Sequence, residues 1–473
     1  MGAIFTIGEK KRRPGVYQRY ENNGTGPVVG ASDGIVAVTY KGDWGKIGKV
    51  YTLGDVSEVD KYLGTTGTAS VVKDIFTAGA SKVIVTRLGS GGTKGTTTLK
   101  DTSASAKDVI TLTAKCEGTR AFSYTIKTVL GDDTTKEFVL YEGTTVRERF
   151  AFTKDGDEVA KLISAAKNSV YFDFTASETY AEGTSLLATV STATVITPGT
   201  SPASVTNADY SDAFERLEPY KFNAICVDTV DTTVHALLAA FVENMFNSGK
   251  SCFAVVGEPT SVAFETRKAH AKAFNSYKVV YVGGAYVIAD GTVIEGYRAA
   301  AVVAATVAKI PSNQSVTHYP IAGAVDVKEM LTNTQYEECI DNGMLVFSVS
   351  DTGTVWIDCG ITTLTTLAGE DDEGWKKIKR TKIRFEMMQR VSESIAPLVG
   401  QIPNNVDGQT NVIELSQKVL DEMIAEVKLQ PGARVEIDPA SAAYGDSVWY
   451  VITADDIDAI EKIYNTFRFR FSA

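Results

Sequence analysis

Apolar strands alternate with helical segments in the middle of the chain, and this alternation constrains the fold more than any other feature. The segments FNAICV (222–227), SCFAVVG (251–257) and YKVVYVGG (277–284) are almost wholly apolar, and helical patterns alternate with them at 210–217, 233–247, 262–275 and 297–309. Strands without a polar face are typical of parallel sheets that helices cover on both sides. We therefore expect a parallel α/β core over residues 206–352.

Two segments before this core have a different character. GIVAVTY (34–40) and SKVIVTRL (81–88) are rich in β-branched residues and predict strands of a small α/β domain over residues 21–89. The composition then changes to the flexible sequence GSGGTKGTTT, which is typical of a junction. Short alternating stretches follow, namely VITLTAK, FSYTIKTV, EFVLYEG and VYFDFTA. They predict an inserted antiparallel β-sandwich or barrel over residues 90–205.

The C-terminal part predicts an α+β domain over residues 353–465. Two long helical patterns, at 374–399 and 412–429, precede the strand candidates ARVEID and SVWYVIT. Thr453 and Asp456 have the spacing of a capping box, which predicts a further helix over 457–465.

Both chain ends have the pattern of short terminal arms, at 1–20 and 466–473. Alternating apolar residues precede the charged KKRR segment, Val16 and Tyr17 follow its Pro-Gly break, and phenylalanines alternate with arginines at the other end. A strand this short must complete a sheet. Pairing within its own chain and addition to the sheet of a neighbouring copy both satisfy that need. Arms that leave the subunit would make heterologous contacts, which build rings or helical filaments.

A basic segment, residues 375–390, stands out in a chain of net charge −11, because it holds seven basic residues and one acidic residue. Lys376, Arg380 and Arg384 are four apart and share one helical face. Ile378, Phe385, Met388 and Ile395 form an approximate apolar stripe. Two interpretations stay open for the basic face: a solvated surface, or a docking face for an acidic partner.

Catalytic motifs are absent from the sequence, which contains no GxGxxG after a strand, no GxxxxGK[ST] and no GxSxG. His235 and His270 fall in amphipathic helices and are expected at the surface, and no histidine has metal-ligand spacing. The acidic run 370–373 is expected to be a solvated loop before a helix. We therefore expect no enzyme, no cofactor and no metal, although a distant Ser/His/acid grouping stays open.

Charge and hydropathy argue against a nucleic-acid-binding protein and against a membrane protein. A net charge of −11 argues against general nucleic-acid binding. The longest apolar run, 299–308, is far shorter than the roughly twenty residues that span a bilayer, and the N-terminus lacks a signal-peptide pattern. Five scattered cysteines without a CxxC pair indicate reduced thiols. We expect a cytoplasmic protein that is not inserted in a membrane.

Several segments, in their order and spacing, resemble contractile tail sheath proteins of phages and defective prophages of Gram-positive bacteria. The resemblance covers nearly the whole chain and rests on KRRPGVY, TNADYSDAFERLEPYKFNAICV, WIDCGITTLTT, EGWKKIKRTKIRFEMMQRVSESI, VGQIPNNVDGQTNV and ITADDIDAIEKIY. It implies a structural subunit that polymerises as stacked hexameric rings around a tail tube. Contraction of such a sheath drives the tube through a cell envelope for genome ejection.

The resemblance also implies roles for particular residues. Arms at about 3–17 and 466–472 would exchange β-strands with the C-terminal domains of neighbouring copies, through Phe5, Ile7, Val16, Tyr17, Phe467, Phe469 and Phe471. The C-terminal domain would face the tube, with contacts from Lys376, Lys377, Lys379, Arg380 and Arg384. The α/β core would have a subtilisin-like shape without a protease role, and the β insertion would point outward.

The implied partners are further copies of this chain, a tail tube protein, and baseplate and tail terminator proteins. The implied location is the virion tail, after assembly in the host bacterial cytoplasm; a complete phage, a defective prophage and a tail-like bacteriocin all fit. Two alternatives come from other classes. The Thr-rich β domain fits a surface adhesin or receptor-binding protein, and the α/β core fits a hydrolase with an unrecognised site.

Overall fold

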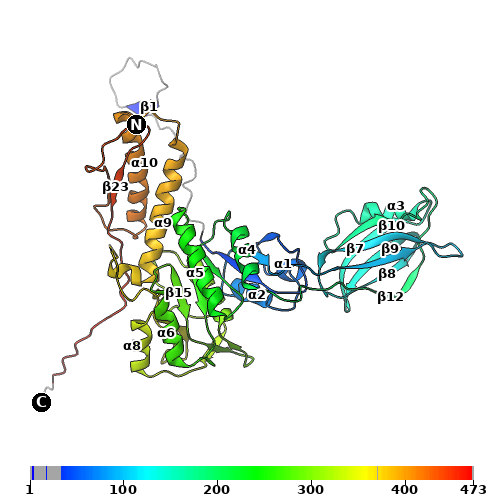
Figure 1. Ribbon diagram of the computed structural model, residues 1–473, viewed down its shortest axis with the longest axis horizontal. Helices are drawn as coiled ribbons and strands as arrows, with labels where there is room; N and C mark the ends of the chain where they lie inside the picture. The colour runs from blue at the N-terminus through cyan, green and yellow to red at the C-terminus, as the bar shows by residue number, and fades with distance from the viewer. Residues whose placement is uncertain (1–2, 5–16, 19–32, 370, 471–473) are drawn as a thin grey trace. The chain divides into compact units, whose positions relative to one another are not determined.

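The computed structural model describes residues 3–4, 17–18, 33–369 and 371–470 (Figure 1). The chain divides into two units, Met1–Ser32 and Asp33–Ala473. In the first unit β1 (Ala3–Ile4) pairs in parallel with β2 (Tyr17–Gln18). Of the predicted arm residues, Phe5, Ile7, Val16 and Phe471 lie outside the described residues.

A seven-stranded sheet forms the centre of the second unit, in the order β19-β15-β14-β13-β3-β5-β4. Neighbouring strands are parallel except for the edge pair β4–β5. The expected parallel α/β core is confirmed, and one sheet takes strands from both 21–89 and 206–352. The strands are β3 (Ile35–Tyr40), β4 (Val50–Leu53), β5 (Lys82–Arg87), β13 (Ala224–Cys226), β14 (Phe253–Gly257), β15 (Val279–Val282) and β19 (Met344–Leu345).

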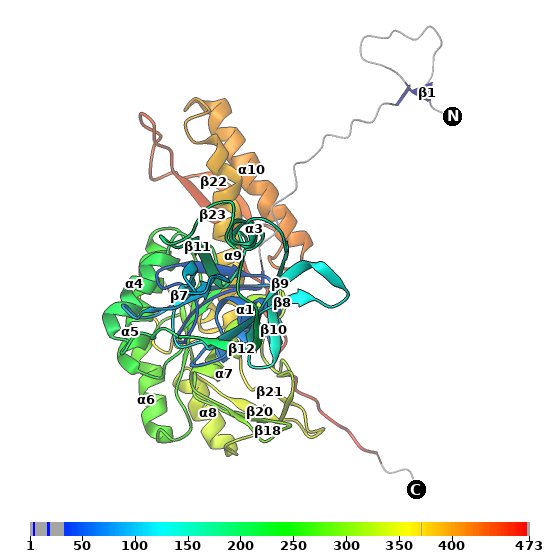
Figure 2. The ribbon, with the colours of Figure 1, turned by 90° about the vertical axis from the view of Figure 1, so that its right-hand side faces the viewer.

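Helices bury both faces of this sheet, which explains why its strands have no polar side (Figure 2). On one face lies α7 (Tyr297–Lys309), whose residues from Ala299 to Ala308 are all buried, together with α1 (Ser57–Tyr62) and α2 (Ser70–Thr77). The other face packs against α4 (Asn207–Leu217), α5 (Thr232–Asn247), α6 (Phe264–Phe274) and α8 (Asn333–Asp341). No helix in the described part of the chain is long and apolar enough to cross a membrane.

Short antiparallel sheets extend this core. One has the order β17-β16-β18 and the other pairs β20 with β21. Their bounds are β16 (Tyr286–Ile288), β17 (Val293–Ile294), β18 (Ala324–Val327), β20 (Phe347–Val349) and β21 (Val355–Ile357).

The expected antiparallel strands between β5 and α4 are confirmed. They form two sheets, β10-β9-β8-β12 and β11-β7-β6, around their own aromatic core. The elements are β6 (Lys94–Lys100), β7 (Asp108–Glu117), β8 (Phe122–Val129), β9 (Asp132–Glu142), β10 (Thr145–Thr153), α3 (Glu158–Ala165), β11 (Phe172–Ala176) and β12 (Val190–Ile196). The insertion bounds 90–205 stay a prediction.

Two long helices and a β-hairpin make up the C-terminal part. The elements are η1 (Glu373–Lys376), α9 (Ile378–Ile395), η2 (Ala396–Leu398), α10 (Val406–Ala425), β22 (Arg434–Ile437) and β23 (Tyr450–Thr453). The second helix starts earlier than predicted, because the Asn405 side chain caps it by accepting from the Gly408 N–H. The hairpin packs on α10 through Val435 and Ile452 against Leu420 and Met423.

The predicted helix over 457–465 is wrong. Thr453 ends β23, and no described residue from 454 to 470 is helical. The spacing of Thr453 and Asp456 matches a capping box, but the Asp456 carboxylate binds arginines of α9 instead. A side chain committed to that ion pair does not cap a helix.

Candidate assembly site

The last described segment, residues 456–470, is extended and begins against helix α9. In Figure 1 it is drawn without helix or strand toward the C-terminus. Its second residue bonds to the loop after α10: the Ile457 N–H donates to the Lys428 carbonyl at 2.9 Å. The Gln430 N–H donates to the Asp455 carbonyl at 2.8 Å. The backbone therefore fixes the point where this segment leaves the hairpin.

Asp456 joins this segment to α9. Its carboxylate accepts from the Arg380 guanidinium, and from Arg384 Nη2 at 2.9 Å. Arg384 also donates to both Asp372 carboxylate oxygens, at 3.0 and 2.9 Å. The Asp456 side chain is only 6% exposed, so this is a largely desolvated, charge-assisted contact. Burial alone would raise the pKa of Asp456, but the hydrogen bonds and charges of the two arginines lower it.

Lys377 makes a second connection one helical turn away. Its ammonium lies 2.7 Å from an Asp458 carboxylate oxygen and 2.9 Å from Glu461 Oε2. Burial opposes the charged form, yet these two carboxylates raise the pKa of Lys377. The other Glu461 oxygen accepts from Ser315 Oγ and Thr317 Oγ1, both at 2.9 Å. From Asp456 to Glu461 the segment is therefore bound to α9, to Lys377 directly before that helix, and to the loop after α7.

Beyond Glu461 the contacts end. Within the described part of the chain, residues 462–470 have no hydrogen bond and join no strand. The Phe467 and Phe469 side chains are 77% and 92% exposed, and their rings stack on each other with centroids 6.4 Å apart. The two rings therefore form a small exposed apolar patch near the end of the described chain.

Four of the five basic residues predicted as tube contacts have carboxylate partners among the described residues. Besides Arg380, Arg384 and Lys377, Lys376 pairs with Glu373 at 3.0 Å. Lys379 is 5% exposed, and burial lowers its pKa. Sequence reasoning identified the basic cluster but missed its counter-ions, Asp456, Asp458 and Glu461. The available signal was a second run of opposite charge, DDIDAIE, near the chain end.

The hairpin of β22 and β23 is a two-stranded antiparallel sheet with register Arg434↔Thr453 to Ile437↔Tyr450. No other described strand pairs with either of its edges. Ile437 and Val451 are about two-fifths exposed on it. Such a sheet presents unpaired backbone groups that accept a further strand.

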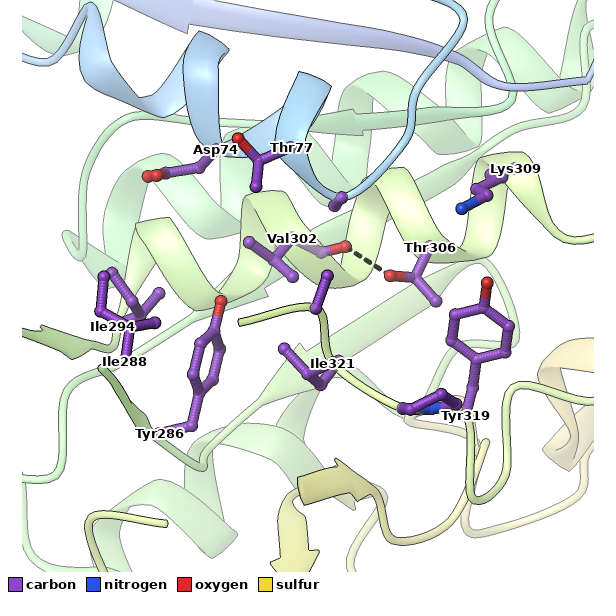
Figure 3. A pocket seen from close by; sticks show the side chains of 13 residues that line it. Asp74, Thr77, Tyr286, Ile288, Ile294, Val302, Thr306, Lys309, Tyr319 and Ile321 are labelled. Carbon is purple, nitrogen blue, oxygen red and sulfur yellow. Dashed lines mark hydrogen bonds between the residues drawn. The ribbon is translucent and has the colours of Figure 1, made fainter. Parts of the chain in front are cut away.

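A cleft of about 300 Å³ between α2, α7 and β16 offers little chemistry (Figure 3). Its walls are largely apolar, from Ile288, Val302 and Ile321 among others. The Asp74 carboxylate at its edge is occupied by the Arg298 guanidinium, with contacts of 2.7 and 2.8 Å. The Thr306 hydroxyl donates to the Val302 carbonyl. The lining residues in the described part of the chain place no nucleophile beside a base.

A second cleft, of about 320 Å³, tests the hydrolase alternative. The buried Glu258 carboxylate accepts from the Tyr281 hydroxyl and lies 2.7 Å from His270 Nδ1. His235 lines the same cleft and is 1% exposed, so its expected surface position is wrong. Burial lowers the pKa of His235. A histidine and an acid converge here, but no serine is among the described residues that line the cleft.

Comparison with known families decides the class of the central domain. Residues 203–363 match the family model for the phage tail sheath protein central domain. The chain carries a phage tail sheath domain. This sheath domain takes in α4 to α8 and the strands β13 to β21, and so supplies four of the seven strands of the central sheet. The family resemblance inferred from the sequence is confirmed.

Relatives extend the similarity on both sides of the sheath domain. The "Uncharacterized protein YqbK" of Bacillus subtilis (strain 168) is 23% identical over 98% of each chain. The "Phage-like element PBSX protein XkdK" of the same organism is 23% identical over 86% of each chain. A "Tail sheath protein" of Clostridium phage phiCD119 is 22% identical over 48% of this chain and 60% of its own.

Solved structures share the fold. The sheath tail protein of Desulfitobacterium hafniense superposes with a TM-score of 0.67 at 20% identity, over 94% of this chain and all of its own. The helical sheath of the anti-feeding prophage in its contracted state gives a TM-score of 0.53 at 11% identity, over 97% and 99%. The mixed α/β multidomain fold around the sheath domain is therefore a fold of sheath proteins.

Proposed function

We propose that this chain is a structural sheath subunit of a contractile tail. It polymerises as stacked hexameric rings around a tail tube and contracts to drive the tube through a cell envelope. The observation that carries this proposal is the sheath domain at 203–363, set in a fold that a solved sheath protein shares over 94% of the chain. Its proposed partners are further copies, the tube, and baseplate and terminator proteins of the virion tail.

The exposed phenylalanines support a role for the C-terminal segment in polymerisation. Phe467 and Phe469 alternate with Arg468, the spacing that places two side chains on one face of an added strand. The two-stranded hairpin of β22 and β23 is the proposed acceptor, because a third strand would bury its exposed apolar residues. The N-terminal arm, including Phe5, Ile7, Val16 and Tyr17, is the proposed second donor.

Replacement of both phenylalanines, Phe467→Ser with Phe469→Ser, tests this role. Both side chains are exposed, so the free energy of unfolding of the monomer should change by less than about 0.5 kcal/mol. Polymer formation, followed by sedimentation and negative-stain electron microscopy with and without tube protein, should be lost. Leu130→Ser, at a fully exposed position of the β insertion, is the control and should polymerise normally.

Two results would count against the proposal. Striated tubes from the double variant would show that the phenylalanines are not required for assembly. Dispersed unmodified protein at every concentration, with tube protein present, would remove the sheath function itself. The adhesin alternative would then be the next hypothesis.

Contact between the basic segment and the tube is a separate part of the proposal. Arg380 and Arg384 are committed to carboxylates of their own chain, so Lys376 is the better probe. Its partner Glu373 is 72% exposed, and surface pairs of this kind are weak enough to exchange for another partner. Lys376→Glu should lower the yield of extended sheath on tubes without affecting polymers formed alone. Lys154→Glu in the β insertion is the matched charge control.

A further inference from the structure

Helix α9 contacts both ends of the second unit: Asp33, where the unit begins, and Asp456, where the extended C-terminal segment starts. Asp33 is the first residue of that unit, and its carboxylate lies 3.5 Å from Lys382 Nζ. Asp456 starts the extended C-terminal segment, and Arg380 and Arg384 hold it. Because each residue of an α-helix is turned about 100° from the last, Lys382 lies on the side of α9 opposite to the two arginines. The bases of the two terminal segments therefore meet opposite faces of one helix.

The N-terminal base is tied to α9 and α7 together. Lys382 is a buried lysine whose ammonium donates to the carbonyls of Val307, at 2.9 Å, of Ala308, at 3.1 Å, and of Ile310. These carbonyls lie at the C-terminal end of α7, where a positive charge is favourable. The Gly34 N–H donates to the same Ala308 carbonyl at 2.9 Å. Asp33 and Gly34 thus start the sheet from a fixed point.

Helix α9 is itself firmly attached to the core. The Phe385 ring packs on Phe253 of β14, with centroids 5.1 Å apart. The neighbouring, buried Glu386 carboxylate binds Ser312 and Lys428, which joins α9 to the loop after α7 and to the segment after α10. A force applied to α9 is therefore passed to both the central sheet and α10.

We propose that α9 anchors the bases of both ends of the second unit. Arg380, Arg384 and Lys377 position the C-terminal arm, and Lys382 holds Asp33, the residue at which the unit begins. This inference rests on the proposed function, since it takes the arms to engage neighbouring copies. An arm with a fixed base loses less conformational freedom when it docks, and its free end stays at a high effective concentration near its acceptor.

Asp456→Asn tests the C-terminal half of the anchor in the full-length protein. Asp455→Asn is the matched control, because the neighbouring Asp455 is exposed and its carboxylate has no hydrogen bond among the described residues. Asp456→Glu keeps the charge and should keep most of the effect. Hydrogen exchange of the Ile457 amide, which is bonded to the Lys428 carbonyl, is measured below the assembly concentration. The protein concentration at which polymers first form is measured by sedimentation.

In Asp456→Asn we expect exchange of the Ile457 amide, which donates to the Lys428 carbonyl, to become about tenfold faster and the polymerisation threshold to rise by about tenfold, because a charge-assisted contact is lost. Exchange within α9 and α10 should stay unchanged, which a general loss of stability would not allow. Asp33→Asn should also raise the threshold while leaving exchange of the Ile457 amide unchanged.

Unchanged exchange of the Ile457 amide in Asp456→Asn would overturn the anchor. Faster exchange with an unchanged polymerisation threshold would show that the contact with α9 does not position the C-terminal arm for assembly. Tubes formed by the Phe467→Ser and Phe469→Ser variant would instead contradict the arm function, and they would leave the exchange result standing. The two failures are therefore distinguishable.

Discussion

At the scale of single residues, Arg87 shows how a buried charge joins two parts of the chain. It ends β5 and has no exposed surface. Its guanidinium donates to the Gly45 carbonyl at 2.8 Å and to the Glu117 carbonyl at 2.5 Å. It also donates to the Gly42 carbonyl and lies 3.3 Å from Ser201 Oγ. Glu117 ends β7 of the β insertion and Ser201 lies in the segment that leaves the insertion, so one side chain joins both to the central sheet.

Arg87→Met should lower the free energy of unfolding by about 3 kcal/mol, because it leaves several buried carbonyls without a donor. Urea unfolding followed by tryptophan fluorescence measures the change. Arg149→Met is the control: Arg149 pairs with Glu137 at a side chain that is 55% exposed, and such pairs contribute little. If both variants lowered the free energy of unfolding equally, Arg87 would not be the link between the insertion and the central sheet.

At the scale of elements, the last segment shows where a local sequence motif misleads. Thr453 and Asp456 have the spacing of a capping box, and that spacing predicted a helix over 457–465. In the structure Ile460 and Ile463 are 85% and 74% exposed on an extended chain. Local patterns cannot include ion pairs with α9, which lies some 75 residues earlier in the sequence and supplies the partners of Asp456, Asp458 and Glu461.

The contact of this segment with α9 should weaken in acid. Arg380 and Arg384 lower the pKa of Asp456, with Asp372 as the other carboxylate facing Arg384. A lowered pKa means that the stabilisation is complete above the unfolded-state value of about 3.9 and is lost as the pH falls through the folded-state value. The ratio of exchange rates of the Ile457 amide between Asp456→Asn and the unmodified protein should therefore be constant near neutral pH. It should fall toward one as the pH falls through the folded-state pKa of Asp456, which lies below the unfolded-state value.

Taking the ratio removes the intrinsic pH dependence of exchange, which is the same in both proteins. Asp372→Asn, which leaves the Asp456 contacts in place, should retain the same acid transition. A ratio that stays constant through the acid range would mean that the Asp456 carboxylate does not carry the contact.

Strands that bury a continuous apolar run could be predicted from the sequence. The ion-pair partner of each charged side chain could not. The strands β3, β5, β14 and β15 follow directly from runs such as VIV and VVYV, because a strand covered on both faces has no other composition. The basic face of α9 was equally plain. Its role depends on which carboxylates the fold brings to it. Neither interpretation of the sequence, a solvated face or a docking face for a partner, included the carboxylates of the same chain that bind it.

At the scale of the whole molecule, the β insertion is connected in a way that permits its removal. Thr93 and Thr200 pair across the two connections, each N–H donating to the other carbonyl at 3.0 Å. The insertion packs around its own cluster of buried side chains, to which the core contributes Trp44. The chain therefore enters and leaves the insertion at adjacent points, as expected for a domain added to an existing fold.

Joining Gly92 directly to Ser201 should leave a folded subunit that still polymerises, because the sheath domain, α9 and the C-terminal segment remain intact. Trp44 is 2% exposed against the insertion and would become solvent-exposed, so the excised protein should also carry Trp44→Ser. Circular dichroism and thermal unfolding report whether the core folds, and electron microscopy with tube protein reports assembly.

The full-length chain with Trp44→Ser alone separates the cost of the substitution from that of the excision. An unfolded product would make the insertion part of the core, against the predicted domain at 90–205. A folded product that stays dispersed would place essential contacts between subunits in the insertion, and the terminal arms would then be insufficient for the sheath.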